Sequence, residues 1–127
     1  VMIKSKKLNK LQNLNHAFFN RAGGRSTGIF KSLNCGPGSN DNKRNILKNL
    51  NIVKKKINTT AKKIVLLKQV HSNKFHFISK NTQVPKKKLE GDALITNRTN
   101  LPIAVLTADC APILIHDKKT KMIALIS

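Results

Sequence analysis

A cysteine and a histidine, far apart in the sequence, each follow an apolar run. Cys110 lies beyond the run 103–106, after the polar turn 107–109, and His71 closes a run that begins at Ile64. The end of a strand often carries chemistry, because the scaffold fixes the backbone there while the side chain meets solvent. The sequence therefore points first to His71 and Cys110 as a pair of functional side chains.

Two chemistries would use such a pair. A neighbouring carboxylate raises the pKa of a thiol, so Asp109 argues against Cys110 as a free thiolate nucleophile. A metal ion removes this difficulty, because a coordinated thiol is deprotonated outright and zinc accepts cysteine and histidine together. The wide spacing of the pair matches no compact zinc finger, which argues against a structural zinc module. A Cys–His hydrolase with Cys110 as nucleophile stays open, as does packing of Cys110 as a small buried thiol.

The remaining histidines and the second thiol are weaker candidates. We expect His16 to satisfy a backbone group and His76, between two phenylalanines, to face solvent from a strand. His116 is a weaker candidate metal ligand at a strand end beside Asp117. Two cysteines cannot form a disulfide framework, and we expect Cys35 to be a packed free thiol.

The strongest loop signal is the stretch 20–28, which contains Gly23 and Gly24 between two arginines. Adjacent glycines permit positive φ, and successive amides in such a loop can form a concavity that binds an anion. Arg21 would add a cation that suits phosphate. An ordinary connection between strands is equally consistent with these residues.

Several elements must position these residues. Ile46, Leu47 and Leu50 recur at helical spacing after capping side chains, which predicts a helix from about residue 41 to residue 50. The lysine-rich stretch 51–63 would then be a polar connection. Short apolar runs predict strands at 17–19, 64–67 (continuing toward His71), 75–78, 92–96, 103–107, 113–116 and 122–126.

Strands predominate and one helix is clear, so the sequence favours an α+β fold of mixed β-sheets flanked by few helices. A length of 127 residues is typical of one small domain with a real core. The last apolar strand runs almost to Ser127 with no closing turn. We therefore expect residues 1–127 to be the N-terminal portion of a single domain that is incomplete at its C-terminus.

The chain is strongly basic, with 25 lysines and arginines against 5 acidic residues and a formal net charge of +20. Such a balance suggests a polyanion partner such as nucleic acid. Only four of these basic residues are arginine, the side chain that reads bases and phosphates bidentately, and no Trp or Tyr is present for base stacking. We therefore expect no specific nucleic-acid partner, and a basic nucleic-acid-binding module remains an alternative motivated by charge alone.

No apolar run reaches the roughly 18 residues that a membrane helix needs. The basic N-terminal stretch has no apolar segment after it, as a secretory signal would require. The sequence is therefore expected to be that of a cytoplasmic protein that does not act at a membrane.

Five motifs occur in order along the chain: the glycine loop 20–28, Ser32-Leu33-Asn34, Gln69-Val70-His71, Asp92-Ala93-Leu94-Ile95-Thr96 and Thr107-Ala108-Asp109-Cys110-Ala111-Pro112. Each motif is weak alone, but five in order are specific. Together, from His16 to Ser127, the sequence resembles the YfiH-like family. Its members were long labelled laccase-domain or multicopper polyphenol oxidase proteins and are understood as purine nucleoside phosphorylases.

The resemblance implies a YfiH-like fold and an enzyme that uses purine nucleosides and phosphate. The implied reaction is phosphorolysis of adenosine or inosine to the free base and ribose 1-phosphate. Cleavage of methylthioadenosine and deamination of adenosine are further activities that the family implies. The implied cofactor is zinc, and copper is also reported for the family.

The resemblance also implies a metal site of two histidines and one cysteine. His71 matches the first histidine and Cys110 the cysteine, so these two residues would be catalytic residues and metal ligands. The second histidine belongs to a His-Ala-Gly-Trp segment expected directly after the last strand, and the chain ends at Ser127 before it. Candidate phosphate- or substrate-binding groups are Arg21, Gly23, Gly24, Asn34 and Asp109, and Asp92 or Asp109 would orient a ligand or bind the ribose hydroxyls.

Overall fold

The computed structural model describes residues 2–84, 86–108 and 110–127, so the site prediction for Asp109 lies outside the described residues. The chain divides into two compact units, Val1–Thr60 and Ala61–Ser127. No helix in the described part of the chain combines the length and the apolar character needed to cross a bilayer.

The first unit begins with a two-stranded antiparallel sheet. Strand β1 (Met2–Ile3) pairs with β2 (Phe18–Phe19), which confirms a strand near residues 17–19. Between them lies the single-turn helix α1 (Lys6–Asn9), whose N-cap Ser5 accepts a hydrogen bond from the Leu8 amide. A 3₁₀ turn, η1 (Gly28–Phe30), follows the glycine loop.

The main helix, α2 (Lys43–Lys56), is longer than the sequence pattern predicts. It starts after Asn42, whose side chain accepts from the Arg44 amide as an N-cap. The prediction that residues 51–56 form a connection is wrong, because the helix continues through them. Lysine is a good helix former, and the three lysines 54–56 in the last turn complement the negative end of the helix dipole.

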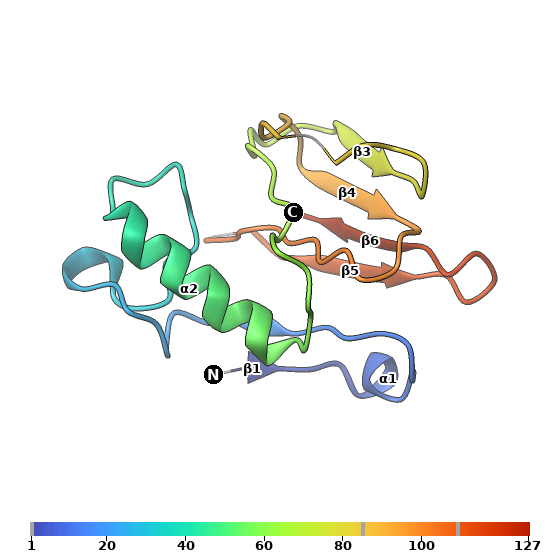
Figure 1. The fold of residues 1–127 in the computed structure, drawn as a ribbon, viewed down its shortest axis with the longest axis horizontal. Coiled ribbons are helices and arrows are strands. Elements are labelled where there is room, and N and C mark those ends of the chain that lie inside the picture. The colour runs from blue at the N-terminus through green and yellow to red at the C-terminus, as the bar shows by residue number, and fades with distance from the viewer. Residues whose placement is uncertain (1, 85, 109) are drawn as a thin grey trace. The chain divides into compact units, whose positions relative to one another are not determined.

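The second unit is built on a four-stranded sheet with the strand order β3-β4-β6-β5, which Figure 1 shows edge to edge. Its strands are β3 (Phe75–Ile78), β4 (Ala93–Thr96), β5 (Ile113–His116) and β6 (Ile123–Ile126), close to the four predicted ranges. Strands β3 and β4 are parallel, whereas β6 is antiparallel to both of its neighbours. The described elements form a mixed sheet with separate helices, which confirms the α+β class.

Two predicted strands, 64–67 and 103–107, are present only as single bridges. Val65 pairs with Ile103 and Lys68 pairs with Glu90, both in parallel orientation. The segment 64–67 is nevertheless buried as expected, with Leu67 3% exposed. Neither bridge extends into a longer ladder. The backbone of Val65 bonds to the segment around Ile103, whereas that of Lys68, three residues later, bonds to the segment around Glu90.

The two faces of the four-stranded sheet differ sharply in burial. One face packs Ile78 and Leu94 against Leu67 to form the core of this unit. His76 alternates with the exposed Phe75 and Phe77 and so lies on the core side, where its Nε2 is 2.6 Å from the carbonyl oxygen of Glu90. The prediction that His76 faces solvent is therefore wrong, because the phenylalanines occupy the exposed positions.

The opposite face of the sheet is apolar and open. The strand register aligns the residues of this face across the four strands: Phe75, Phe77, Ala93, Ile95, Ile126, Ala124, Ile113 and Ile115. Its outer positions are strongly exposed, with Phe75 at 62% and both Ile113 and Ile115 at 50%. We call these eight residues the open apolar face.

Candidate functional site

Cys110 is an exposed free thiol just before strand β5. An exposed thiol contributes little to a core, so packing does not explain the residue. The segment before it is anchored to the rest of the unit, because the Ala104 amide donates to the carbonyl of Val65 at 3.0 Å. Cys110 is thus open to solvent, as a ligand or nucleophile requires, and the segment that leads to it is anchored at Ala104.

His71 adopts a left-handed backbone conformation, with φ of +57°. This conformation costs a residue other than glycine about 1–2 kcal/mol, so the surrounding structure must supply compensating bonds. The carboxylate of Asp92 provides them: it accepts from the amides of Val70 at 3.3 Å, His71 at 3.1 Å and Ser72 at 2.7 Å. The loop that presents the imidazole is therefore held in one shape by a single side chain.

Asp92 is itself buried, with 3% of its surface exposed, and both its backbone amide and its backbone carbonyl are hydrogen-bonded. Its amide donates to the Lys74 carbonyl, and its carbonyl accepts from the Ser127 amide. The hydrogen bond from the Ser72 amide does most to hold the pKa of Asp92 below its ordinary value. The Ser72 hydroxyl and the amides of Val70 and His71 lower this pKa further, and desolvation opposes them. The residue is thus ionised at neutral pH, which is the form that accepts four hydrogen bonds.

Gln69 connects the histidine segment to the cysteine segment. Its side-chain oxygen accepts from the Leu106 amide at 2.7 Å, and its side-chain nitrogen donates to the Leu106 carbonyl at 2.6 Å. This paired contact extends the parallel alignment that begins at the Val65–Ile103 bridge. The structure therefore places the chain segments that lead to His71 and to Cys110 side by side.

The donor chemistry of His71 and Cys110 suits a metal such as zinc or copper. Imidazole and thiolate are ligands that both metals accept, and in the described part of the chain the His71 imidazole has no hydrogen bond to displace. Among the described residues no group of three His, Cys, Asp or Glu side chains could hold a metal ion. The two residues thus fit part of a catalytic site, which would need a third ligand.

The glycine loop of the first unit is shaped by a close backbone approach. A Cβ on Gly24 would lie 2.1 Å from the carbonyl oxygen of Ser32, so only glycine fits there. Gly23 has a φ of +96° and open space around it. The Gly24 amide already donates to the Ser32 hydroxyl at 3.1 Å, so an anion bound at this amide would have to compete with that bond. The Arg21 side chain is exposed beside the loop.

A buried asparagine of α2 holds this loop in place. Asn49 is fully buried, and its side chain accepts from the Arg25 amide at 2.7 Å and donates to Ser26 at 2.9 Å and to the Asn34 carbonyl at 2.8 Å. The Asn34 side chain is also engaged, because it donates to Ser39 at 2.8 Å and accepts from the Gly36 amide at 3.1 Å. Asn34 therefore supports the loop in the described structure.

The other predicted positions have simpler surroundings. His16 is buried and its Nε2 accepts from the Ser5 amide at 2.7 Å, which confirms a backbone role. His116 is half-buried on β5 beside Asp117. Cys35 is a half-buried free thiol, and burial raises its pKa to about 11, so it is protonated and unreactive at neutral pH.

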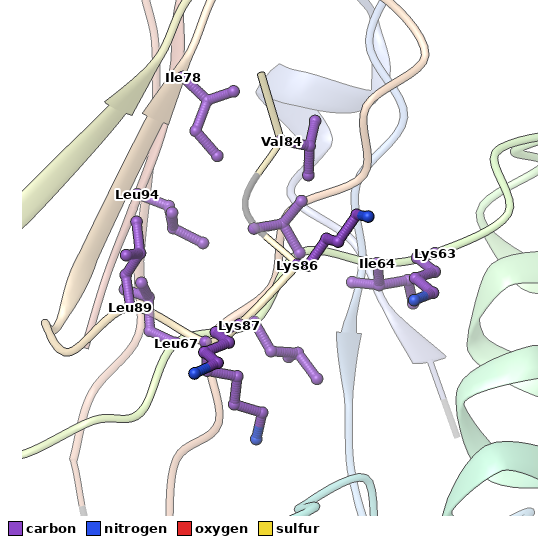
Figure 2. A pocket seen from close by; sticks show the side chains of 12 residues that line it. Lys63, Ile64, Leu67, Ile78, Val84, Lys86, Lys87, Leu89 and Leu94 are labelled. Carbon is purple, nitrogen blue, oxygen red and sulfur yellow. The ribbon is translucent and has the colours of Figure 1, made fainter. Parts of the chain in front are cut away.

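A cavity of about 130 Å³ lies in the second unit, between the segment 63–67 and the sheet. Figure 2 shows the apolar side chains of Leu67, Ile78 and Leu94 in its wall and lysines around it, Lys86 among them. The described residues that line it include no His, Cys, Asp or Glu. The cavity is therefore a gap at the edge of the core and holds none of the predicted site residues.

Sequence reasoning missed two supporting residues, Gln69 and Asn49, and gave Asp92 a general role only. Each acts through bonds from its side chain to a distant backbone, across 37 positions for Gln69 and 24 for the Arg25–Asn49 bond. The one available signal was the position of Gln69 within the Gln69-Val70-His71 motif. Local patterning cannot show the distant partner.

Comparisons with known proteins identify the family of this chain. Residues 15–126 match the family model described as "Multi-copper polyphenol oxidoreductase laccase". A protein of Bacteroides thetaiotaomicron named purine nucleoside phosphorylase is 30% identical over 131 aligned residues, which cover 98% of this chain and 48% of the relative. A Clostridium acetobutylicum protein of the same name is 38% identical over 97 residues, covering 76% of this chain and 35% of the relative.

The fold also matches solved structures. The crystal structure of the Bacillus licheniformis hypothetical protein YfiH superimposes with a TM-score of 0.79 at 26% identity, covering 87% of this chain and 43% of that one. The chain thus spans about half or less of the length of the relatives that it matches. The family model, the relatives and the shared fold confirm the YfiH-like resemblance: this chain belongs to the multi-copper polyphenol oxidoreductase laccase family, the YfiH-like proteins.

Proposed function

We propose that this chain is the N-terminal portion of a metal-dependent purine nucleoside phosphorylase. The relatives' names support the reaction class. The observation that carries the proposal is the tie between Gln69 and Leu106, which aligns the segments that present His71 and the exposed Cys110.

In the proposed reaction, the bond between the ribose anomeric carbon and the purine nitrogen breaks and a bond from that carbon to a phosphate oxygen forms. Inosine and phosphate then give hypoxanthine and ribose 1-phosphate, and adenosine gives adenine. Negative charge develops on the leaving purine, which takes up the proton that the attacking hydrogen phosphate gives up. Methylthioadenosine cleavage and adenosine deamination are further activities within this proposal.

His71 and Cys110 would hold the metal, zinc or the copper of the family's name, together with a third ligand that the resemblance places after β6. A bound divalent metal would supply Lewis-acid stabilisation of negative charge. Arg21 is proposed to bind phosphate, because its exposed guanidinium suits a phosphate oxygen pair. A role for Gly23, Gly24 or Asn34 in phosphate binding, and for Asp109 with the ribose, belongs to the same hypothesis.

The test is to incubate the full-length protein with inosine and phosphate and to measure hypoxanthine and ribose 1-phosphate. We expect release that depends on phosphate and is lost on chelation and in His71→Ala and Cys110→Ser. His116→Ala is a matched control that should retain activity, because the ligand set that the resemblance implies does not include this weaker candidate. Activity that survives chelation but not thiol alkylation would instead identify a Cys–His hydrolase, and base release without phosphate would overturn the proposal.

A further inference from the structure

Two side chains outside the proposed ligand set bond to the backbone of the segments that carry His71 and lead to Cys110. We propose that Asp92 and Gln69 are positioning residues that fix the His71 loop and align it with the Cys110 segment; this inference rests on the proposed function. Neither residue is a candidate ligand in it. Each acts through the backbone of the segment that carries a ligand.

The first step concerns Asp92 and the shape of the loop. A left-handed residue is maintained only where its surroundings determine it, and three consecutive amides, 70–72, all donate to this one carboxylate. The Ser72 hydroxyl adds a fourth bond at 2.8 Å. Because Asp92 immediately precedes β4, the loop is attached to a central strand of the sheet.

The second step concerns Gln69 and the distance between the two segments. A side-chain amide that both donates to and accepts from Leu106 reproduces the bonding of a neighbouring strand. His71 follows Gln69 by two positions and Cys110 follows Leu106 by four. Loss of either bond would let one segment move relative to the other just before the proposed ligands.

The third step concerns the effect of the two positioning residues on metal affinity. Ligands held in place before binding lose less freedom on coordination, and loss of the groups that orient them typically weakens metal affinity by about 10–100-fold. The two positioning residues make independent contacts, so each should weaken affinity when changed alone. A role confined to folding would change stability and leave affinity in the folded protein unaltered.

The test uses Co²⁺ as the probe metal, because its bond to a thiolate gives a charge-transfer absorption band. The full-length protein carries Cys35→Ser, so that Cys110 is the remaining thiol of residues 1–127. Loss of the band in His71→Ala and Cys110→Ser would show that both residues bind the metal. Asp92→Asn cannot accept all the amides, and Gln69→Glu cannot donate to the Leu106 carbonyl, so each should weaken Co²⁺ affinity about tenfold or more.

Asp117→Asn is the matched control. Asp117 also accepts from a backbone amide, that of Lys119 at 3.0 Å, and from the Thr120 hydroxyl at 2.8 Å, but it closes the β5–β6 turn. The Co²⁺ affinity of this variant should stay within twofold of that of the parent protein. All affinities are measured at a temperature well below the unfolding midpoint of every variant. Gln69→Glu keeps the test open if Asp92→Asn does not fold.

Two results would overturn the inference in distinguishable ways. If His71→Ala and Cys110→Ser lose the band while Asp92→Asn and Gln69→Glu bind Co²⁺ like the parent protein, the ligands stand and the positioning role is wrong. If the band persists without His71 or Cys110, the metal site of the proposed function is wrong and the positioning role has no ligand to serve.

Discussion

Single side chains set the chemistry of this molecule through their surroundings. The two cysteines illustrate this, because one is exposed and the other half-buried. Burial disfavours the thiolate of Cys35 and raises its pKa to about 11, whereas Cys110 stands in solvent. Reactivity therefore belongs to Cys110, the thiol that the proposed function uses.

This difference gives a prediction for pH-dependent alkylation. At pH 8 iodoacetamide should modify Cys110 well before Cys35, and Cys35 should react readily only as the pH approaches 11. Mass spectrometry of proteolytic fragments taken over time measures both rates. Equal rates at pH 8 in the folded protein would contradict the burial of Cys35, and the urea-unfolded chain is the control in which the rates should converge.

The same shift fixes the direction of one contribution to stability. The folded state holds the Cys35 proton more tightly than the unfolded state, whose thiol has a pKa of 9.0. The associated stability is present below pH 9 and is lost as the pH rises toward 11. Asp92 acts in the opposite sense, because its lowered pKa contributes stability above its ordinary value of 3.8 that is lost in more acidic solution.

At the scale of elements, the second unit depends on strand β4. It is a central strand that pairs with β3 on one side and β6 on the other, and its Leu94 is 0% exposed in the core. The sheet also attaches the His71 loop through Asp92, which directly precedes this strand. Packing at Leu94 is therefore linked to the geometry of the proposed site.

We predict that Leu94→Ala destabilises the second unit by about 2–5 kcal/mol, the usual cost of emptying a leucine site in a core. Ile115→Ala, on the half-exposed edge strand β5, should cost only about 1 kcal/mol because little area is buried there. Urea denaturation followed by far-UV circular dichroism measures both. Equal losses from the two variants would show that the core does not centre on Leu94.

The sequence predicted elements better than the contacts between them. Alternation and apolar runs located the four strands of the larger sheet, because each strand is short and locally patterned. The pattern placed the end of α2 too early, because the lysines after residue 50 continue the helix. It also placed His76 on the solvent side of β3, whereas Phe75 and Phe77 occupy the exposed positions. The proposed ligands came from motif order, whereas the supports from Asp92 and Gln69 join residues 20 to 37 positions apart and leave no local pattern.

At the scale of the whole molecule, two properties oppose each other. The formal net charge of +20 repels neighbouring copies, whereas the open apolar face exposes large side chains on both edges of the sheet. Charge repulsion is long-ranged and weakened by salt, with a Debye length of about 8 Å at physiological ionic strength. Attraction between apolar surfaces acts at contact and is not screened in this way.

This balance predicts that the 127-residue chain scatters more light as NaCl is added. Replacing Ile113 and Ile115 by threonine, which keeps strand propensity, should flatten the response. Ile29→Thr is the control, because Ile29 is 93% exposed yet belongs to η1 of the first unit and not to the sheet. Scattering that falls with salt, or that the paired threonines leave unchanged, would contradict the prediction.

The open apolar face thus has a practical meaning for anyone who handles this protein. A buffer of ordinary ionic strength weakens the non-specific binding of many basic proteins to nucleic acid. In this protein the same salt would screen the charge repulsion that keeps the molecules dispersed. Colloidal behaviour would follow from eight residues on one side of one sheet. Dilute, low-salt solution is where the isolated chain should remain monodisperse.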